Sequence, residues 1–180
     1  MKSTKLLITD HEIILRALHL LDERVMESER GKELNRDDIR SLLVFFRDFA
    51  DGCHHVKEEA ILFPALLQAG MAFRESPLRV IGYEHECGRV LTSEMSESLD
   101  RNNKKTFLVS ARRYIRLLNE HIEKENYVLF GMADQLLSDE EDERVASDFE
   151  QFERTTGIQT HESAHDAIVA LEAKSLDAVA

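Results

Sequence analysis

A short internal repeat of histidines, glutamates and apolar residues limits how this chain can fold. The segment HHVKEEAILF, which begins at His54, aligns without a gap on HIEKENYVLF, which begins 67 residues later at His121. Both copies contain the spacing HxxxE, and each is preceded by one isolated histidine. These histidines are His11 in the string DHE and His85 in the string EHE. Because residues four positions apart share one face of a helix, the chain reads as two helix pairs that each offer the same polar group.

The rest of the sequence favours long helices. The 180 residues include only 7 Gly and 2 Pro, and the apolar residues recur at helical spacing. We expect helices over 9–28, 35–68, 76–99, 105–137 and 138–155, and a last helix from 160. Thr9 or Asp10 would cap the first helix, and Ser138 with Glu141 would form a capping box for the fifth. The predicted fold is all-α: an up-down-up-down four-helix bundle over 1–137, with 138–180 forming an acidic helix and a C-terminal helix that pack on or cap the bundle.

Helical register also predicts which side chains face the core of the bundle. On the first helix Leu15 and Leu18 share a face with His11, and on the fourth helix Val128 and Met132 are in register with the repeat. The isolated histidines and the HxxxE groups lie on these apolar faces. We therefore expect the polar groups to point inward together.

The charge balance narrows the classes of partner. Lys and Arg number 23 against 35 Asp and Glu, which gives a net charge of −12. Nucleic acids and anionic membranes need a basic face, so we expect neither as a partner. No stretch approaches the roughly 20 apolar residues of a membrane span, and the first residues lack a signal-peptide pattern. We expect a soluble, cytoplasmic protein whose cysteines, Cys53 and Cys87, stay reduced.

Four histidines and two glutamates at the centre of an apolar bundle need a partner. The six residues are His11, His54, Glu58, His85, His121 and Glu125. Buried imidazoles and carboxylates pack poorly unless something satisfies them, and a pair of metal ions would do so. Imidazole suits iron, zinc, copper or nickel, and carboxylates add a preference for harder ions that they can bridge. Two bridging glutamates with open coordination positions fit a di-iron centre better than a closed tetrahedral zinc site.

These residues give the chain a resemblance to a known family. From about residue 9 to 132 the chain is similar to the hemerythrin-like (HHE cation-binding) proteins, and CHHVKEEAILFPAL resembles the signature on that family's second helix. The resemblance implies a four-helix bundle around two non-haem iron ions with an oxo or hydroxo bridge. It also implies His11, His54, His85 and His121 as terminal ligands, with Glu58 and Glu125 as bridging carboxylates.

The chain also departs from the oxygen-carrying members of that family. Those members carry HxxxH on the third helix, where this chain has Arg89 four residues after His85. They carry HxxxxD on the fourth helix, where this chain has HxxxE. The fifth histidine is therefore missing from its usual place. Its absence there disfavours reversible oxygen carriage and favours the members linked to iron, nitric oxide or peroxide.

Several further residues admit more than one interpretation. His55 and Glu59 offer the HxxxE spacing one position later, but the second copy lacks both residues, so this register is the less favoured one. His55 is either the missing fifth ligand, a donor behind the ligands or a histidine of the helix surface, and Glu59 is an additional candidate ligand. Lys57 and Lys124 recur at one repeat position and either form charge pairs or, as we favour, are solvated.

The string HESAH at 161–165 matches the zinc-protease pattern HExxH. Because the repeat already accounts for a metal centre, we favour an exposed amphipathic helix that packs through Ile168, Leu171 and Leu176. Cys53 and Cys87 each lie within two residues of a histidine. A redox role near the metals is one interpretation, and a small buried side chain is the favoured one.

The sequence therefore supports three functions of different classes. In the first, a di-iron protein binds or senses dioxygen or nitric oxide, or stores iron. In the second, the same centre belongs to an enzyme that reduces nitric oxide, dismutes peroxide or delivers iron for iron–sulfur cluster repair. In the third and least favoured, the chain is a metal-free helical interaction module. We predict a protein that binds or reacts with small oxidants, or handles iron under oxidative or nitrosative stress, with an unknown redox partner.

Overall fold

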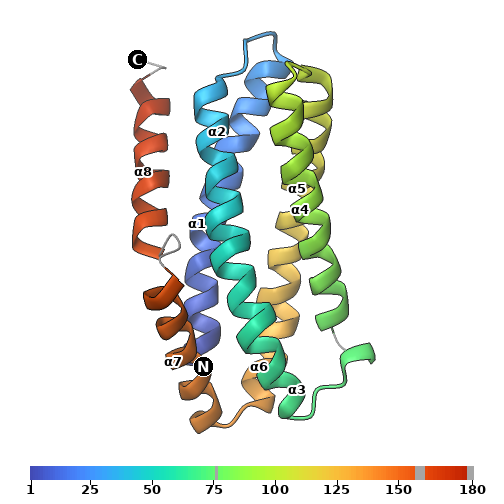
Figure 1. The fold of residues 1–180 in the computed structure, drawn as a ribbon, viewed down its shortest axis with the longest axis vertical. Coiled ribbons are helices and arrows are strands. Elements are labelled where there is room, and N and C mark those ends of the chain that lie inside the picture. The colour runs from blue at the N-terminus through green and yellow to red at the C-terminus, as the bar shows by residue number, and fades with distance from the viewer. Residues whose placement is uncertain (76, 157–160, 178–180) are drawn as a thin grey trace.

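The structure, a computed structural model, describes residues 1–75, 77–156 and 161–177, and all regular secondary structure in these ranges is helical. Four long helical stretches stand side by side along the long axis of the molecule (Figure 1). Their helices are α1 (Lys2–Glu29), α2 (Arg36–Phe45) leading into α3 (Phe63–Gln68), α4 (Leu78–Asp100), and α5 (Lys104–Lys124) leading into α6 (Phe130–Leu136). The remaining elements are a short 3₁₀ turn (Phe73–Glu75), α7 (Asp139–Thr156) and α8 (His161–Asp177). The all-α prediction is confirmed for the described residues.

Two of the long stretches change from α-helical to π-helical winding where the repeat lies. The π-helical segments are Phe46–His55, Glu58–Leu62 and Glu125–Leu129. The last two begin at the equivalent glutamates of the repeat. The backbone N–H of Phe63 donates to the carbonyl of Glu58, and the N–H of Phe130 donates to the carbonyl of Glu125. Such turns insert one extra residue into a helix and are frequent at functional sites.

The extra residues shift the side chains that follow them. Leu129 and Phe130 are buried, whereas Val128 and Met132 are exposed. The expectation that Val128 and Met132 face the core is therefore wrong, because an unbroken α-helical register does not continue through a π-helical turn. Leu15 on α1 is also exposed, so the predicted apolar stripe of that helix is only partly buried.

A polar layer separates two apolar clusters along the bundle. On α1, Leu7 belongs to one cluster and Ile14 to the other, and His11 lies between them in the chain. On the second long stretch, Phe49 and Leu62 are divided between the clusters in the same way. Close-packed apolar side chains therefore lie on both sides of the layer that carries the histidines.

The two C-terminal helices pack against the bundle, mainly on α1 (Figure 1). The predicted capping box is present, since the backbone N–H and the hydroxyl of Ser138 both donate to Glu141 at 2.8 Å. α8 buries Ile168 and Leu171 as predicted, while the side chain of Leu176 and the expected helix start at 160 lie outside the described part of the chain. Within the described ranges, every helix is too short or too polar for a membrane span.

α1 begins earlier than its predicted cap. The helix starts at Lys2, and the backbone N–H groups of Lys2 and Ser3 donate to Asp142 of α7 at 2.7 and 3.0 Å. A carboxylate from another helix thus satisfies N–H groups of the first turn and complements the helix dipole. Thr9 and Asp10 are therefore not caps. Asp10 lies buried in the middle of α1, beside the polar layer.

Candidate metal centre

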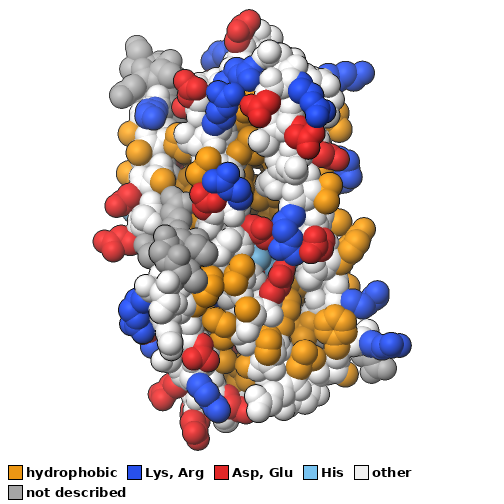
Figure 2. All heavy atoms as spheres, viewed as in Figure 1, with side chains coloured by type: hydrophobic (Ala, Val, Ile, Leu, Met, Phe, Trp, Pro, Cys, Tyr) orange, Lys and Arg blue, Asp and Glu red, His pale blue; other side chains and the backbone are white. Residues whose placement is uncertain are grey.

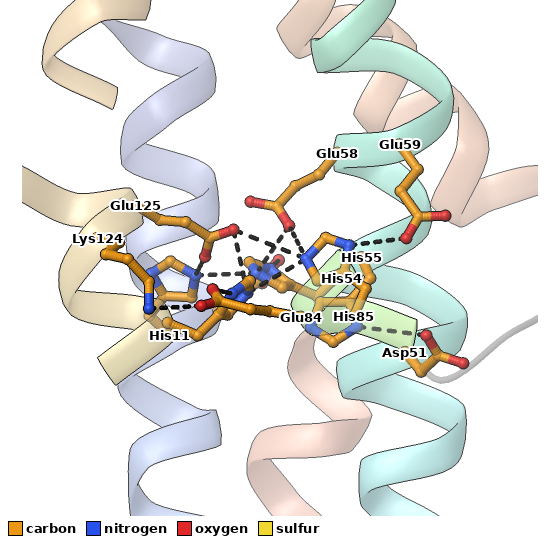
Figure 3. Close-up of polar contacts among 12 residues, drawn as sticks. His11, Asp51, His54, His55, Glu58, Glu59, Glu84, His85, Lys124 and Glu125 are labelled. Atoms are coloured by element: carbon orange, nitrogen blue, oxygen red, sulfur yellow. Dashed lines mark hydrogen bonds and ion pairs between the residues drawn. The ribbon is translucent and has the colours of Figure 1, made fainter. Parts of the chain in front are cut away.

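The six side chains expected as ligands come together in the middle of the bundle. They are His11, His54, Glu58, His85, His121 and Glu125, and each is 1% exposed or less. One histidine comes from α1 and one from α4, and each of the other two long stretches contributes one histidine and one glutamate. Figure 3 shows the imidazole and carboxylate groups of this cluster turned toward one another.

The contacts inside the cluster join ring nitrogens to one another and to carboxylate oxygens. The Nε2 atoms of His11 and His54 lie 2.9 Å apart, and those of His85 and His121 lie 3.2 Å apart. Glu125 reaches both pairs, because its oxygens lie 3.0 Å from His11 Nε2 and 3.1 Å from His121 Nε2. One carboxylate therefore contacts both histidine pairs, one from each half of the internal repeat.

Glu58 makes a second connection between the pairs. Its carboxylate lies 3.7 Å from His54 Nε2 and 3.4 Å from His85 Nε2. Ligand atoms within 4.8 Å of one another form two groups that share both glutamates. The first half-site consists of His11, His54, Glu58 and Glu125, and the second half-site of Glu58, His85, His121 and Glu125. Each of these groups could hold a metal ion, and the two groups have both carboxylates in common.

A further histidine lies against the second half-site. His55 forms a third group with His85 and His121, whose ligand atoms also lie within 4.8 Å. Its ring stacks on that of His85, with 3.9 Å between the centroids. His55 is buried, which excludes the surface interpretation. Its Nδ1 lies 3.3 Å from Asp51, and its Nε2 has no hydrogen-bond partner among the described residues.

The buried polar atoms of the cluster test whether a metal fits. All four carboxylate oxygens of Glu58 and Glu125, together with Nε2 of His55, are buried and form no hydrogen bond of standard geometry in the described part of the chain, although Glu125 lies within ion-pair distance of His11 and His121. Leaving such a group unsatisfied costs about 1–3 kcal/mol, and more if it is charged. Iron and other divalent metals accept imidazole and carboxylate ligands, so cations would satisfy all five atoms together. The residues present therefore fit a pair of metal ions.

A ring of oxygen acceptors holds the histidines from outside. Each of the five histidines places Nδ1 between 2.7 and 3.3 Å from an oxygen of another residue. The pairs are His11 with Asn126, His54 with Asp10, His55 with Asp51, His85 with Glu59, and His121 with Glu84. We call these five acceptors the outer ring. An acceptor on Nδ1 draws the proton there and leaves the Nε2 lone pair for a metal. Glu59 thus lies in the outer ring, outside both half-sites.

The outer contacts follow the internal repeat. Glu59 and Asn126 are equivalent positions, and each accepts from one of the two isolated histidines. Phe63 and Phe130 are also equivalent, and they stack on the same two histidines with centroids 6.2 and 5.6 Å apart. Equivalent residues of the internal repeat therefore make equivalent contacts in the two halves of the centre.

The repeated lysines contact two acceptors of the outer ring. Lys57 Nζ lies 2.6 Å from Asp10, and Lys124 Nζ lies 2.7 Å from Glu84. The Lys57 side chain is 2% exposed, whereas that of Lys124 is 37% exposed. The expectation that both lysines are solvated is therefore wrong for Lys57. Its burial is compensated by the carboxylate charge that it contacts.

Sequence reasoning missed the outer ring, although part of its signal was present. An acidic residue directly precedes each isolated histidine, Asp10 before His11 and Glu84 before His85. The structure uses both acids as acceptors for the histidines of the repeat. Asp51 carries no comparable signal, because it lies on a π-helical segment whose register the sequence does not reveal.

Arg89, which stands where the oxygen carriers have a histidine, lies at the edge of the second half-site. Its guanidinium contacts Asp51 at 2.7 Å and Glu59 at 3.2 Å, the acceptors of His55 and His85. A groove of about 510 Å³ between the second long stretch and α4 has Asp51 and Arg89 in its wall. Figure 2 shows this face of the molecule, where a histidine side chain is visible among acidic and basic ones.

Neighbouring charges set the protonation of the metal-free cluster. Burial alone would lower the pKa of His85, but Glu125 and the other carboxylates around it raise this pKa to about 11. Burial also opposes a charge on His121, but its glutamate neighbours raise its pKa to about 9. Burial and the nearby histidines hold the pKa of His55 well below its usual value, so that ring is neutral. Metal ions entering this cluster would displace protons from the first two rings.

The zinc-protease string does not form a metal site among the described residues. His161 Nδ1 lies 2.9 Å from Asp10, and His165 is exposed on α8 with Asp166 3.5 Å away. No group of ligand atoms in the described ranges includes either histidine. The favoured interpretation of this string as part of a packed amphipathic helix agrees with the burial of its apolar residues.

The two cysteines are free thiols. Burial raises the pKa of Cys53 to about 12, so this thiol stays protonated and unreactive. That state agrees with the favoured interpretation of Cys53 as a small buried side chain. Cys87 is partly exposed on α4, so the favoured interpretation as a small buried side chain is wrong for this cysteine.

Comparisons with known proteins agree with this arrangement. The family model described as Hemerythrin HHE cation binding domain matches residues 2–133. Three uncharacterized proteins, one from Mycobacterium bovis and two from Mycobacterium tuberculosis, are each 26% identical to the chain over 177 residues. These matches cover 94% of this chain and 68% of each relative. No solved structure gives a significant match. Because the family match spans most of the chain and both half-sites, the chain belongs to the hemerythrin HHE cation-binding family.

Proposed function

We propose that the chain is a non-haem di-iron protein. One iron would bind in the first half-site and the other in the second half-site, with His55 as an additional ligand there. Glu58 and Glu125 would bridge the two ions. The observation that carries this proposal is the set of five buried polar atoms, on these three residues, that converge on one cluster and form no hydrogen bond of standard geometry in the described part of the chain. Two iron ions supply redox chemistry toward small oxidants that side chains alone do not provide.

The protein residues would prepare the centre for its ions. The outer ring holds the Nδ1 protons of the five histidines, so each ring can present Nε2 to a metal without reorientation. Glu58 and Glu125 would offset part of the positive charge of the ions. The two apolar clusters exclude water from both sides of the polar layer, which strengthens the interaction of the carboxylates with a cation.

The enclosure of the centre supports a small ligand or substrate. The cluster is buried, so a molecule of a few atoms suits it, and the groove that Asp51 and Arg89 line lies next to the acceptor of His55. We therefore propose that the protein binds or reacts with dioxygen, nitric oxide or peroxide, or handles iron under oxidative or nitrosative stress. It would do so in the cytoplasm, with electrons from an unknown redox partner.

We further propose that residues 1–137 form the functional unit, an up-down-up-down four-helix bundle, and that residues 138–180 are an extension. Short connections between successive long helices favour antiparallel neighbours. The connections after α1 and α4 span only a few residues each. The ligands of both half-sites all fall within 1–137.

Anaerobic titration of the metal-free protein with ferrous iron tests this proposal. We expect two ions per chain. The variant Glu58→Gln/Glu125→Gln keeps the shape of both side chains and removes both bridging charges, so it should stay helical and lose tight uptake of at least one ion. His19→Ala is the matched control, because His19 is an exposed histidine of α1. Uptake by the double glutamine variant equal to that of the wild type would contradict the assignment of the bridges.

A second candidate function is catalysis at the same centre: reduction of nitric oxide, dismutation of peroxide or delivery of iron for iron–sulfur cluster repair. The groove beside the second half-site favours it, because turnover needs exchange of small molecules with solvent. Adding excess peroxide to the ferrous protein, or excess nitric oxide together with an external electron donor, separates the two functions. Consumption of about one equivalent per centre indicates binding, and consumption of many equivalents indicates an enzyme. A metal-free interaction module would take up no iron at all.

A further inference from the structure

The C-terminal helices contact the outer ring at the first half-site. Asp10, the acceptor of His54, is buried, and His161 of α8 places Nδ1 2.9 Å from its Oδ1. Lys57 Nζ lies 2.6 Å from Oδ2 of Asp10 and 2.7 Å from Glu153 of α7. One residue outside the matched family region, His161, therefore contacts the carboxylate that accepts from His54, and a second, Glu153, contacts the lysine that pairs with this carboxylate.

The two oxygens of Asp10 have separate partners. His54 Nδ1 and Lys57 Nζ both lie at Oδ2, whereas His161 lies at Oδ1. Contacts at both oxygens fix the rotation of the carboxylate plane, and that plane sets the direction in which His54 donates. The ammonium group of Lys57 also pairs with this carboxylate and favours its charged form. Asp10 is therefore a fixed anionic acceptor.

Among the described residues, the equivalent carboxylate of the second half-site has no contact from a C-terminal helix. Glu84 occupies the position equivalent to Asp10, and its two oxygens also have separate partners, since His121 Nδ1 lies 3.1 Å from Oε2 and Lys124 Nζ lies 2.7 Å from Oε1. What differs is that Asp10 has a third contact, from His161 of α8. Both Glu84 and Lys124 are more exposed than their counterparts. The repeat thus builds two similar outer contacts, and the C-terminal helices cover only one of them.

We propose that the C-terminal extension is a positioning element for the first half-site: His161, acting through Asp10 and supported by Glu153, holds His54 in its ligating orientation. This inference rests on the proposed di-iron function. Its consequence is that the two ions leave the protein at different rates. The ion of the first half-site is held by a ligand that cannot turn away easily, so the extension slows the loss of that ion and leaves the other unaffected.

The test follows the removal of iron from the full-length ferrous protein by a chelator under anaerobic conditions. In His161→Ala we expect half of the bound iron to leave roughly tenfold faster than in the wild type, and the other half to leave at its wild-type rate. The total bound at saturation should stay at two ions. His165→Ala is the matched control, because His165 lies one turn further on the same helix and does not contact Asp10. His161→Asn keeps an N–H donor at the same place and should restore slow release.

Two further variants separate positioning from a general loss of stability. Glu153→Gln perturbs Asp10 through Lys57 and should accelerate the same half of the iron as His161→Ala. Glu84→Gln weakens the equivalent contact of the second half-site and should accelerate the other half, so that a combined His161→Ala/Glu84→Gln variant loses both ions quickly. Far-ultraviolet circular dichroism should show wild-type helicity in every variant.

Three results would overturn the inference. The first is that both His161→Ala and Glu153→Gln release iron at the wild-type rate. The second is that these variants release both ions faster by the same factor. The third is that His161→Ala and Glu84→Gln accelerate the release of the same half of the iron. A wild-type chain that binds fewer than two ions would overturn the proposed di-iron function, and this inference with it. Normal loading with unchanged release in the variants would overturn the inference alone.

Discussion

Lys57 and Lys124 occupy the same position of the internal repeat and contact equivalent carboxylates, yet Lys57 is buried and Lys124 reaches solvent. The difference arises from the C-terminal helices, because Glu153 of α7 closes over Lys57 and has no described counterpart at Lys124. One sequence motif thus encodes two environments. The contribution of the lysine–carboxylate contact to the free energy of unfolding should therefore differ between the two positions.

Replacing each lysine by methionine in turn measures this difference. Lys57→Met leaves Asp10 and Glu153 without the cation that joins them in a buried setting, so we expect the free energy of unfolding to fall by about 3–5 kcal/mol. Lys124→Met removes a partly exposed pair and should cost no more than about 1 kcal/mol. Urea unfolding of the metal-free variants, followed by circular dichroism, gives both numbers. Equal losses in the two variants would contradict the buried role of Lys57.

His55 should act on one ion only. His55→Ala removes a ring that lies with His85 and His121 in the second half-site, so one of the two iron ions should bind about 10–100-fold more weakly. The ion of the first half-site should keep its affinity, because His55 is not part of that group. Calorimetric titration with ferrous iron resolves the two steps. Wild-type affinity in both steps would show that His55 is not a ligand.

The metal-free protein should lose stability as the pH rises. In the folded state the pKa of His121 is raised to about 9 and that of His85 to about 11, whereas both lie near 6.5 in an unfolded chain. Their charged forms therefore stabilise the fold fully below about pH 6.5, and this contribution declines until the pH has passed the folded pKa values. Thermal melting at several values between about pH 6 and pH 10 should show a falling midpoint. A midpoint that rises over this range would contradict the raised pKa values.

Metal uptake should release protons for the same reason. At neutral pH His85 and His121 carry protons in the metal-free cluster, and a metal ion needs the unprotonated ring. Iron affinity should therefore increase with pH. Calorimetry in buffers with different ionisation enthalpies should show release of one or more protons per chain on loading. Uptake without proton release would mean that these two rings are neutral before the metal binds.

The sequence was sufficient to locate the polar layer because its information is local. Each HxxxE group lies within one helical turn, so four-residue spacing alone places His54 beside Glu58 and His121 beside Glu125. The isolated histidines followed from their apolar neighbours on α1 and α4. The assignment of all six residues as metal ligands remains a prediction that the titrations above test.

The features that the sequence does not predict depend on contacts between segments that are distant in the chain. The π-helical turns at Glu58 and Glu125 have no distinct residue pattern, so α-helical periodicity predicts the wrong face for Val128. The burial of Lys57 depends on Glu153, almost a hundred residues away in the chain. The cap of α1 comes from Asp142 of α7 for the same reason. Helical periodicity describes one helix at a time and does not show which side chains another helix will cover.

Iron content is the measurement that tests the central claim most directly. Wild type, His54→Ala/His121→Ala and the exposed-residue control His19→Ala would be purified from iron-supplemented cells and analysed by mass spectrometry for metal per chain. We expect about two irons in the wild type and in the control, and less than about half an iron in the double variant, because each half-site loses one of its histidines. A wild-type protein that is fully helical and carries no iron, or a double variant that keeps both ions, would contradict the di-iron centre described above.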